Sequence, residues 1–208
     1  LWDEPFGEVF EEDFENGVFK WFTGGTLNVF RTVGDAFSGS GGNRYALVFY
    51  DGDGARTDYS WDDLSTRVST TAAGLQSLGI AHGSRLALYL PDRPATFITM
   101  LACASLGVTY VPIPHNYTAE ITGEILADCG ASHVLVDLSS PLRSYTGRAE
   151  AIISANSGIS FVTTGGEAAD SVIQFDSLNG DIERVTLEPS DASNPLFILY
   201  ANAATGIP

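Results

Sequence analysis

The final stretch of the sequence combines residue types and spacing that could bind an anion. An apolar run from Leu196 to Tyr200 follows Asn194-Pro195. It predicts a short buried strand, because it is brief, rich in aromatic residues and bounded by proline. A loop of small residues, 201–208, comes next. Small side chains let backbone N–H groups approach a ligand closely, which is how phosphate loops work. The pattern therefore indicates a phosphate-binding loop.

Histidine and acidic residues could build a metal or catalytic site, but their spacing argues against one. His82, His115 and His133 share no metal-ligand spacing. The run 51–54, Asp-Gly-Asp-Gly, is typical of a hairpin turn, since an EF-hand loop needs further oxygen ligands and a glutamate at its twelfth position. No nucleophile lies at a recognisable spacing from a base. We therefore predict no catalytic residue and no metal ligand, and a hydrolase is unsupported.

The chain is strongly acidic. It has 208 residues, with 26 acidic and 10 basic side chains and a formal net charge of −16. This charge disfavours nucleic-acid binding, because phosphate backbones bind basic surfaces. The first twenty residues carry seven acidic side chains against the single lysine, Lys20. Two interpretations of this stretch stay open: a solvated arm, or a surface that docks on a basic protein partner.

Two cysteines, Cys103 and Cys129, lie in separate apolar helical contexts. Two cysteines make no disulfide framework, and buried free thiols are common, so we predict that both are reduced. That favours a reducing intracellular compartment, either the cytoplasm or an organelle matrix. The longest apolar stretch, 97–113, is broken by threonine, serine and glycine, which predicts a buried helix, turn and strand rather than a transmembrane segment.

Strands and helices that could position the anion loop alternate along the chain. Apolar runs bounded by turn residues predict strands, and apolar residues recurring at three and four predict helices. Expected strands are 45–50, 56–59, 85–90, 109–113, 133–137, 160–164 and 196–200, with 172–175 as a further candidate, and expected helices are 31–37, 61–78, 94–106 and 118–129. Repeated β-α-β units require parallel strands with right-handed crossovers. We therefore predict an α/β fold, a doubly wound and mainly parallel sheet with a small β-hairpin, whose ligands bind beyond the carboxyl ends of the strands.

The sequence predicts two parts. Residues 1–43 form an extended N-terminal segment. Its first thirty residues are irregular, with the aromatic side chains Phe19, Trp21 and Phe22 in need of burial and a turn at Gly24-Gly25. Residues 44–208 form the α/β subdomain that ends at the phosphate loop.

Three stretches resemble the adenylate-forming, or AMP-binding, superfamily, and in particular its acetyl- and propionyl-CoA synthetase branch. Residues 21–28 match the pattern Trp-Phe-x-Gly-Gly-x-Leu-Asn at six positions. Residues 79–107 are similar to the family's Leu-Gly-Val to Met-Leu-Ala-Cys-Ala region, and 195–208 to its phosphate loop. The resemblance implies the first subdomain of the large synthetase domain, in a family that uses ATP, magnesium and coenzyme A to activate a carboxylate.

The phosphate loop departs from the family pattern, Tyr-Thr-Ser-Gly-Ser/Thr-Thr-Gly-x-Pro-Lys-Gly. Tyr200, Thr205, Gly206 and Pro208 match, which implies Thr205 and Gly206 as the remaining contacts to ATP phosphate. Alanines stand at 201, 203 and 204, where the family has threonine, glycine and serine or threonine. Two hydroxyl donors are therefore missing, and a β-carbon restricts the backbone at 203. The loop is a degenerate one, and no cofactor is predicted to bind it tightly.

A basic segment implies a second ligand contact. Short-chain synthetases carry an Arg-x-Gly-Arg/Lys segment whose basic groups meet the phosphates of coenzyme A. Arg148 follows Gly147 and aligns with it, and Arg143 aligns with a gap. The planar guanidinium suits phosphate oxygens, although two solvated surface arginines would look the same in the sequence.

Two functional interpretations remain, with an unrelated nucleotide-binding module as a third. The chain is the N-terminal part of an acetyl- or short-chain acyl-CoA synthetase-like protein, catalytically inactive as this chain. Alternatively, it is a non-catalytic structural or scaffold subunit of a larger assembly derived from that fold.

Overall fold

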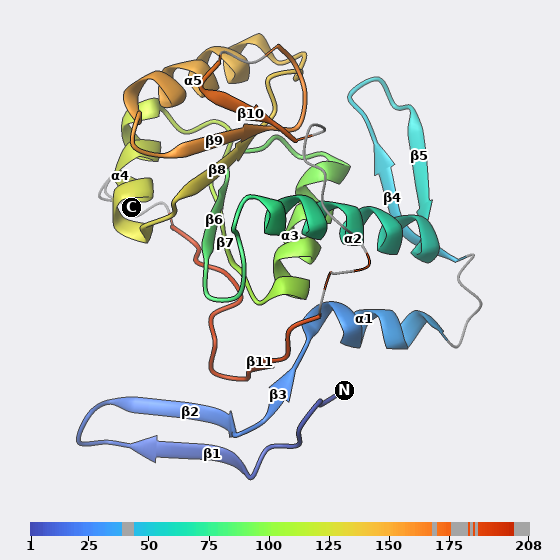
Figure 1. The fold of residues 1–208 in the computed structure, drawn as a ribbon, viewed down its shortest axis with the longest axis vertical. Coiled ribbons are helices and arrows are strands. Elements are labelled where there is room, and N and C mark those ends of the chain that lie inside the picture. Colours follow the sequence, from blue (N-terminus) through green and yellow to red (C-terminus); the bar gives the residue numbers. More distant parts are fainter. Residues whose placement is uncertain (39–43, 168–169, 176–182, 184, 186, 202–208) are drawn as a thin grey trace.

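A parallel sheet of five strands organises the computed structural model, which describes residues 1–38, 44–167, 170–175, 183, 185 and 187–201 (Figure 1). The strand order is β10-β9-β8-β6-β7, and all neighbours are parallel. The strands are β6 (Arg85–Leu88), β7 (Thr109–Pro112), β8 (His133–Val136), β9 (Ser160–Thr163) and β10 (Val172–Gln174). The predicted parallel α/β sheet is confirmed, including the candidate strand at 172–175.

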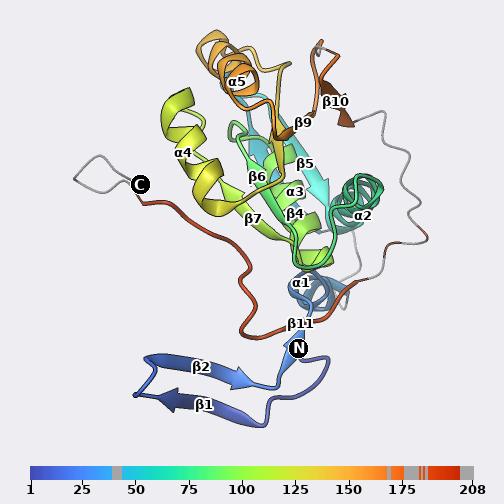
Figure 2. The same ribbon diagram turned by 60° about the vertical axis from the view of Figure 1, so that its left-hand side comes forward.

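Helices cover both faces of this sheet. In Figure 2, α4 (Ala119–Cys129) and α5 (Arg143–Ala155) lie on one side, and α2 (Trp61–Ser77) lies on the other with α3 (Pro94–Leu106). Because side chains alternate along a strand, Leu86 and Leu88 of β6 pack with α2 and α3, whereas Ala87 packs with α4 and α5. The sheet is therefore doubly wound, as predicted.

Local signals in the sequence set the helix ends. Ser60 and Asp63 form a capping box at the start of α2, each side chain accepting a hydrogen bond from the other residue's backbone N–H. Gly107 ends α3 with φ 65°, a left-handed conformation that glycine adopts readily.

Helix α5 was not predicted from the sequence. Its first turns contain serine, threonine and glycine, which are weak helix formers, and no side chain caps its start. Burial stabilises it instead, since Tyr145, Ala149 and Ile152 recur at four and three residues and all face the core.

Both cysteines are free and buried, as predicted. Burial raises the pKa of the Cys103 thiol and of the Cys129 thiol, which keeps both protonated near neutral pH. Among the helices that the structure describes, none is long and apolar enough to cross a bilayer.

Two hairpins flank the sheet. The predicted one is present as β4 (Tyr45–Tyr50) and β5 (Arg56–Ser60), and the Asp51 carboxylate accepts hydrogen bonds from two backbone N–H groups in its turn. The other is formed by β1 (Glu8–Asp13) and β2 (Val18–Thr23), followed by β3 (Thr26–Leu27) and α1 (Val29–Ser38). A short strand, β11 (Ser190–Asp191), pairs with β3.

This N-terminal hairpin corrects two predictions. Residues 8–23 are not irregular but pair in a regular antiparallel register. Their aromatic side chains are not buried either, because Phe19 is 53% exposed and Trp21 57% exposed. The two-stranded ribbon extends away from the sheet (Figures 1 and 2), in agreement with the exposure of its rings.

The strand predicted at 196–200 is also wrong. Phe197 forms one isolated parallel bridge with Tyr110, in which Tyr110 N–H donates to the Leu196 carbonyl and Ile198 N–H donates to the Tyr110 carbonyl. The next parallel hydrogen bond would require a backbone N–H at Pro112, which proline lacks. Pairing therefore ends after one bridge.

Candidate functional site at the carboxyl edge of the sheet

The site lies where the winding of the sheet reverses. Helix α3 follows β6 on one face and α5 follows β8 on the other, although β6 and β8 are neighbours. Connections that leave neighbouring strands on opposite faces open a crevice at the carboxyl ends of those strands. The residues that enter this crevice come from the ends of β6 and β8.

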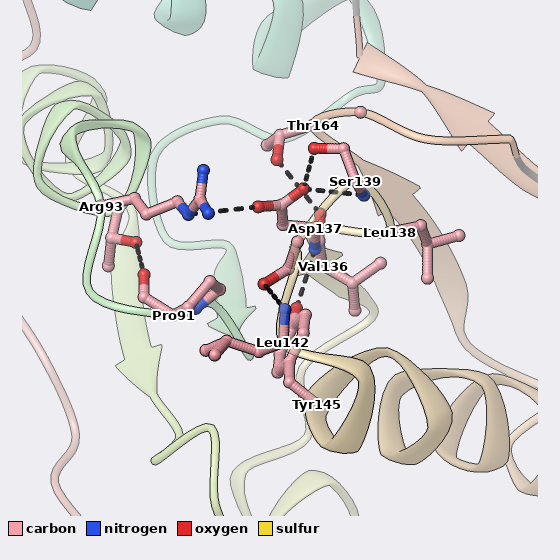
Figure 3. Close-up of polar contacts among 12 residues, drawn as sticks. Pro91, Arg93, Val136, Asp137, Leu138, Ser139, Leu142, Tyr145 and Thr164 are labelled. Atoms are coloured by element: carbon pink, nitrogen blue, oxygen red, sulfur yellow. Dashed lines mark hydrogen bonds and ion pairs between the residues drawn. The ribbon is translucent and has the colours of Figure 1, made fainter. Parts of the chain in front are cut away.

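Asp137, the residue after β8, is the centre of a polar cluster in this crevice (Figure 3). Its side chain is nearly buried, at 5% exposure. The carboxylate accepts hydrogen bonds from the backbone N–H of Ser139 at 3.0 Å and from the Ser139 hydroxyl. The Nε of Arg93 lies 3.9 Å from Asp137 Oδ2. The buried negative charge is thus compensated by donors and by one guanidinium.

Two tyrosines connect β6, β8 and α5 beneath this cluster. The Tyr145 hydroxyl donates to the Tyr89 carbonyl at 2.7 Å and accepts from the Asp137 N–H at 2.8 Å. The two rings stack with centroids 5.3 Å apart. Burial raises the pKa of Tyr145 above its usual value, so its hydroxyl keeps its proton near neutral pH and can donate.

Tyr89 also holds the side chain of Arg148. Arg148 Nε donates to the Tyr89 hydroxyl at 3.3 Å, and its Nη2 donates to the His115 carbonyl at 3.0 Å. The Tyr89 hydroxyl in turn lies 2.9 Å from the His115 carbonyl oxygen and 3.0 Å from that of Tyr117. A guanidinium is thereby fixed beside the loop that follows β7, at the edge where ligands of such sheets bind.

The two arginines singled out in the sequence have different environments. Arg148 is half-buried and held by the contacts above, whereas Arg143 is exposed at the first residue of α5. Residues five apart on a helix point roughly 140° away from each other, so the two guanidiniums do not converge on one ligand. Only Arg148 faces the crevice network.

A cleft of about 700 Å³ opens beside this network. The turn of the β4–β5 hairpin forms one wall, and the residues after β6 and before α5 form the other, together with His115. Its charged lining residues are Asp51, Asp53, Asp92 and Arg93. The cleft can therefore take a ligand that combines an anionic group near Arg93 with polar or cationic groups near the three carboxylates.

Over the described ranges, no three His, Cys, Asp or Glu side chains lie close enough to hold a metal ion. The other predicted contacts, Thr205 and Gly206, lie outside the described residues.

Sequence reasoning missed Tyr89, Asp137 and Tyr145. The first two directly follow strands of a parallel sheet, so their position at the carboxyl edge was a usable signal. Tyr145 had none, because it lies in the unpredicted helix.

The N-terminal motif has a structural explanation. A side chain at Gly25 would bring a β-carbon within 2.8 Å of the Trp2 ring, so glycine is required there. The Asn28 side chain is buried; its Nδ2 donates at 2.9 Å to the carbonyls of Ser105 and Glu188, and its Oδ1 caps α1. The motif joins the hairpin to the end of α3.

Comparison with known proteins identifies the family to which this fold belongs. The family model described as AMP-binding enzyme matches residues 36–208, so the chain belongs to the AMP-binding enzyme family. This confirms the family predicted from the three motifs.

Particular relatives are acetyl-coenzyme A synthetases. The one from Chromobacterium violaceum is 30% identical over 221 residues, and the one from Burkholderia lata is 31% identical over 222. Each comparison covers 100% of this chain and 34% of the synthetase, so the chain spans about a third of their length. Acetoacetyl-CoA synthetase from Streptomyces lividans has the same fold over 98% of this chain and 32% of its own, with a TM-score of 0.81 and 20% identity.

Proposed function

We propose that this chain provides the coenzyme-binding edge of a short-chain acyl-CoA synthetase-like protein, as its N-terminal part, and does not form acyl-adenylates by itself. The observation that carries the proposal is the fixed guanidinium of Arg148 at the carboxyl edge of the sheet. A preorganised guanidinium binds a phosphate group with little loss of side-chain entropy. Coenzyme A carries such phosphates. The proteins named above that resemble this chain are acetyl-coenzyme A synthetases and an acetoacetyl-CoA synthetase.

The inactivity follows from the sequence of the phosphate loop. Alanine at 201 and 204 removes two hydroxyl donors, and alanine at 203 restricts the backbone. Each lost hydrogen bond to a charged group is worth about 1.5–3 kcal/mol, so two weaken ATP binding about 100-fold or more. Magnesium-ATP, when bound in a synthetase, supplies the adenylyl group that activates the carboxylate, with pyrophosphate as the leaving group; the residues described here would contribute only binding and orientation.

Calorimetric titration with coenzyme A tests the first part. We expect binding to the chain, a loss of about tenfold or more in Arg148→Ala, and unchanged affinity in Arg143→Ala, which removes an equal charge from the exposed face. Equal losses in both variants would mean that the arginines act only through net charge.

Carboxylate-dependent release of pyrophosphate, with magnesium-ATP, tests the second part. We expect no turnover above a control without protein. Turnover, or micromolar affinity for magnesium-ATP, would show that the loop at 201–208 still works.

A non-catalytic scaffold subunit is the second candidate. The exposed aromatic side chains of the N-terminal hairpin favour it, because such a surface suits a lasting protein contact. Failure of coenzyme A to bind, together with a stable partner complex, would favour this candidate over the first.

A further inference from the structure

The aromatic row is the least explained surface of the molecule. It consists of Phe14, Phe19, Phe10 and Trp21, whose rings contact one another in that order with centroids 5.8, 6.2 and 4.6 Å apart. Cross-strand pairing places Phe10 opposite Trp21, so both lie on one face of the hairpin. All four rings are between 39% and 73% exposed. Contiguous exposed apolar surface of this kind marks an interaction site.

The row is anchored at its inner end and free at its outer end. Phe22 continues it and packs with Trp2 and Phe6, at centroid distances of 5.4 and 5.2 Å. Phe22 adopts a left-handed backbone with φ 57°, which is costly for an aromatic residue. This turn of the backbone fixes the direction of the hairpin, which extends away from the sheet in both views (Figures 1 and 2). An isolated two-stranded hairpin is only marginally stable in water, so a covering partner would stabilise it.

Carboxylates surround the row. Glu8 and Glu12 share the face of Phe10, because they lie two residues away from it on either side along β1. A hollow of about 450 Å³ is lined by Glu11, Glu12, Asp13 and Lys20 among others, and of these only Glu12 shares the face of the row, because Glu11, Asp13 and Lys20 alternate to the opposite face. Aromatic faces and carboxylates together recognise cations whose carbon stems are apolar, which describes lysine and arginine side chains.

We propose that the aromatic row and its flanking carboxylates form a docking surface for a basic polypeptide segment in which lysine or arginine alternates with aliphatic residues. The aliphatic residues cover the rings, and the cations lie over ring faces or pair with Glu8 and Glu12. The net charge of −16 disfavours a second copy of this chain as the occupant, because like charges repel. The same charge disfavours nucleic acid and anionic lipid surfaces.

The test is a titration of the full chain with a synthetic peptide of alternating lysine and leucine, and with a control peptide in which glutamate replaces lysine. We expect the lysine peptide to bind and the glutamate peptide not to bind. Because Trp21 becomes covered, its fluorescence emission moves to shorter wavelength, and this shift is lost in Trp21→Phe.

Two double variants and one control double variant separate specific docking from general attraction between opposite charges. Phe19→Thr with Trp21→Thr keeps the charge and uses a residue favoured in strands, and we expect at least about tenfold weaker binding. Glu8→Gln with Glu12→Gln leaves the rings in place and should weaken binding and lower its dependence on salt. The matched control, Glu120→Gln with Glu124→Gln, removes the same charge from exposed positions on α4 and should bind as the unmodified chain does.

The proposal is overturned if both peptides bind equally, if no variant differs from the control, or if neither peptide binds. Sedimentation of the chain without peptide provides a further check. A dimer that dissociates in the Phe19→Thr, Trp21→Thr variant would identify a second copy as the occupant and would likewise reject the basic segment.

Discussion

The carboxyl edge of the sheet and the N-terminal hairpin both contain several aromatic side chains, yet they use them in opposite ways. At the sheet edge, Tyr89 and Tyr145 are fully buried, and their hydroxyls are held by neighbouring backbone and side-chain groups. In the hairpin, Phe19 and Trp21 are more than half exposed, and both rings contact the Phe10 ring of the same hairpin. In the first region the tyrosine hydroxyls have their partners within this chain, whereas in the second the rings stay exposed.

Asn28 connects the hairpin to the body of the molecule, at the end of α3 that precedes β7 and not at the carboxyl edge of the sheet. Its side chain binds the carbonyl of Ser105 at the end of α3 and also starts α1, directly after the strand that leaves the hairpin. The hairpin is therefore fixed to the body through its base and not through its aromatic face. This arrangement separates the contacts that stabilise the fold from those available for binding, and four measurements can test the separation.

The largest expected difference is between core and hairpin truncations. Leu86 is fully buried in β6, so Leu86→Ala should lower the free energy of unfolding by about 2–5 kcal/mol. Phe19→Ala removes a larger side chain but should change it by less than about 0.5 kcal/mol, because the ring is mostly in water. Urea unfolding of both variants gives the two values, and a similar loss in each would mean that the hairpin is part of the core.

The loss of unfolding free energy at Asn28, which connects the hairpin to the body, should lie between these two values. Asn28→Ala removes the cap of α1 and leaves two carbonyls without their donor, at a cost of about 2–3 kcal/mol. Asn16→Ala, at the exposed hairpin turn, provides the control and should change global stability by less than about 0.5 kcal/mol. A neutral Asn28→Ala variant would contradict the role given to this side chain.

The tyrosine network should show a smaller effect. Tyr145→Phe keeps the ring but leaves the Asp137 N–H and the Tyr89 carbonyl without a partner, at a cost of about 1–3 kcal/mol. Tyr50→Phe removes a hydroxyl from an exposed ring and should be neutral. Thermal unfolding compares the two, and equal midpoints would show that water replaces the buried hydroxyl.

The sequence predicted the sheet region far better than the hairpin, for a physical reason. Helix α3 starts at Pro94 and ends before Gly107 as expected, because proline and a left-handed glycine are local signals that packing rarely overrides. The strand predicted at 196–200 failed because its pairing depends on its neighbour, where Pro112 lacks the next donor. A prediction made from residues 196–200 alone cannot take account of a proline in a neighbouring strand.

The site shows the same limit. Arg148 was found through a motif, but the groups that hold it, Tyr89 and the His115 carbonyl, lie on elements far apart in the sequence. Burial of Trp21 was expected from its size, since large rings are usually covered. That expectation requires other parts of the described chain to cover the ring, and in the hairpin they do not, since Trp21 is 57% exposed.

The smallest expected effect is a difference in pH dependence between the two regions. Burial in the sheet lowers the pKa of His133 below its usual 6.5, so the unfolded chain takes up this proton first as the pH falls. Global stability should therefore begin to fall below about pH 6.5, and His133→Gln should flatten that part of the profile.

At the hairpin turn, the Asn16 side chain and backbone lower the pKa of Asp13 below 3.8. Its stabilising effect is present above that value and is lost as the pH falls through the lower, folded-state pKa. Urea unfolding follows the first change and Trp21 emission the second. Because the described contacts join the hairpin to the body at its base, Trp21 emission should stay constant from pH 7 to pH 5 while global stability declines. A parallel decline would show that the hairpin and the sheet respond as one unit.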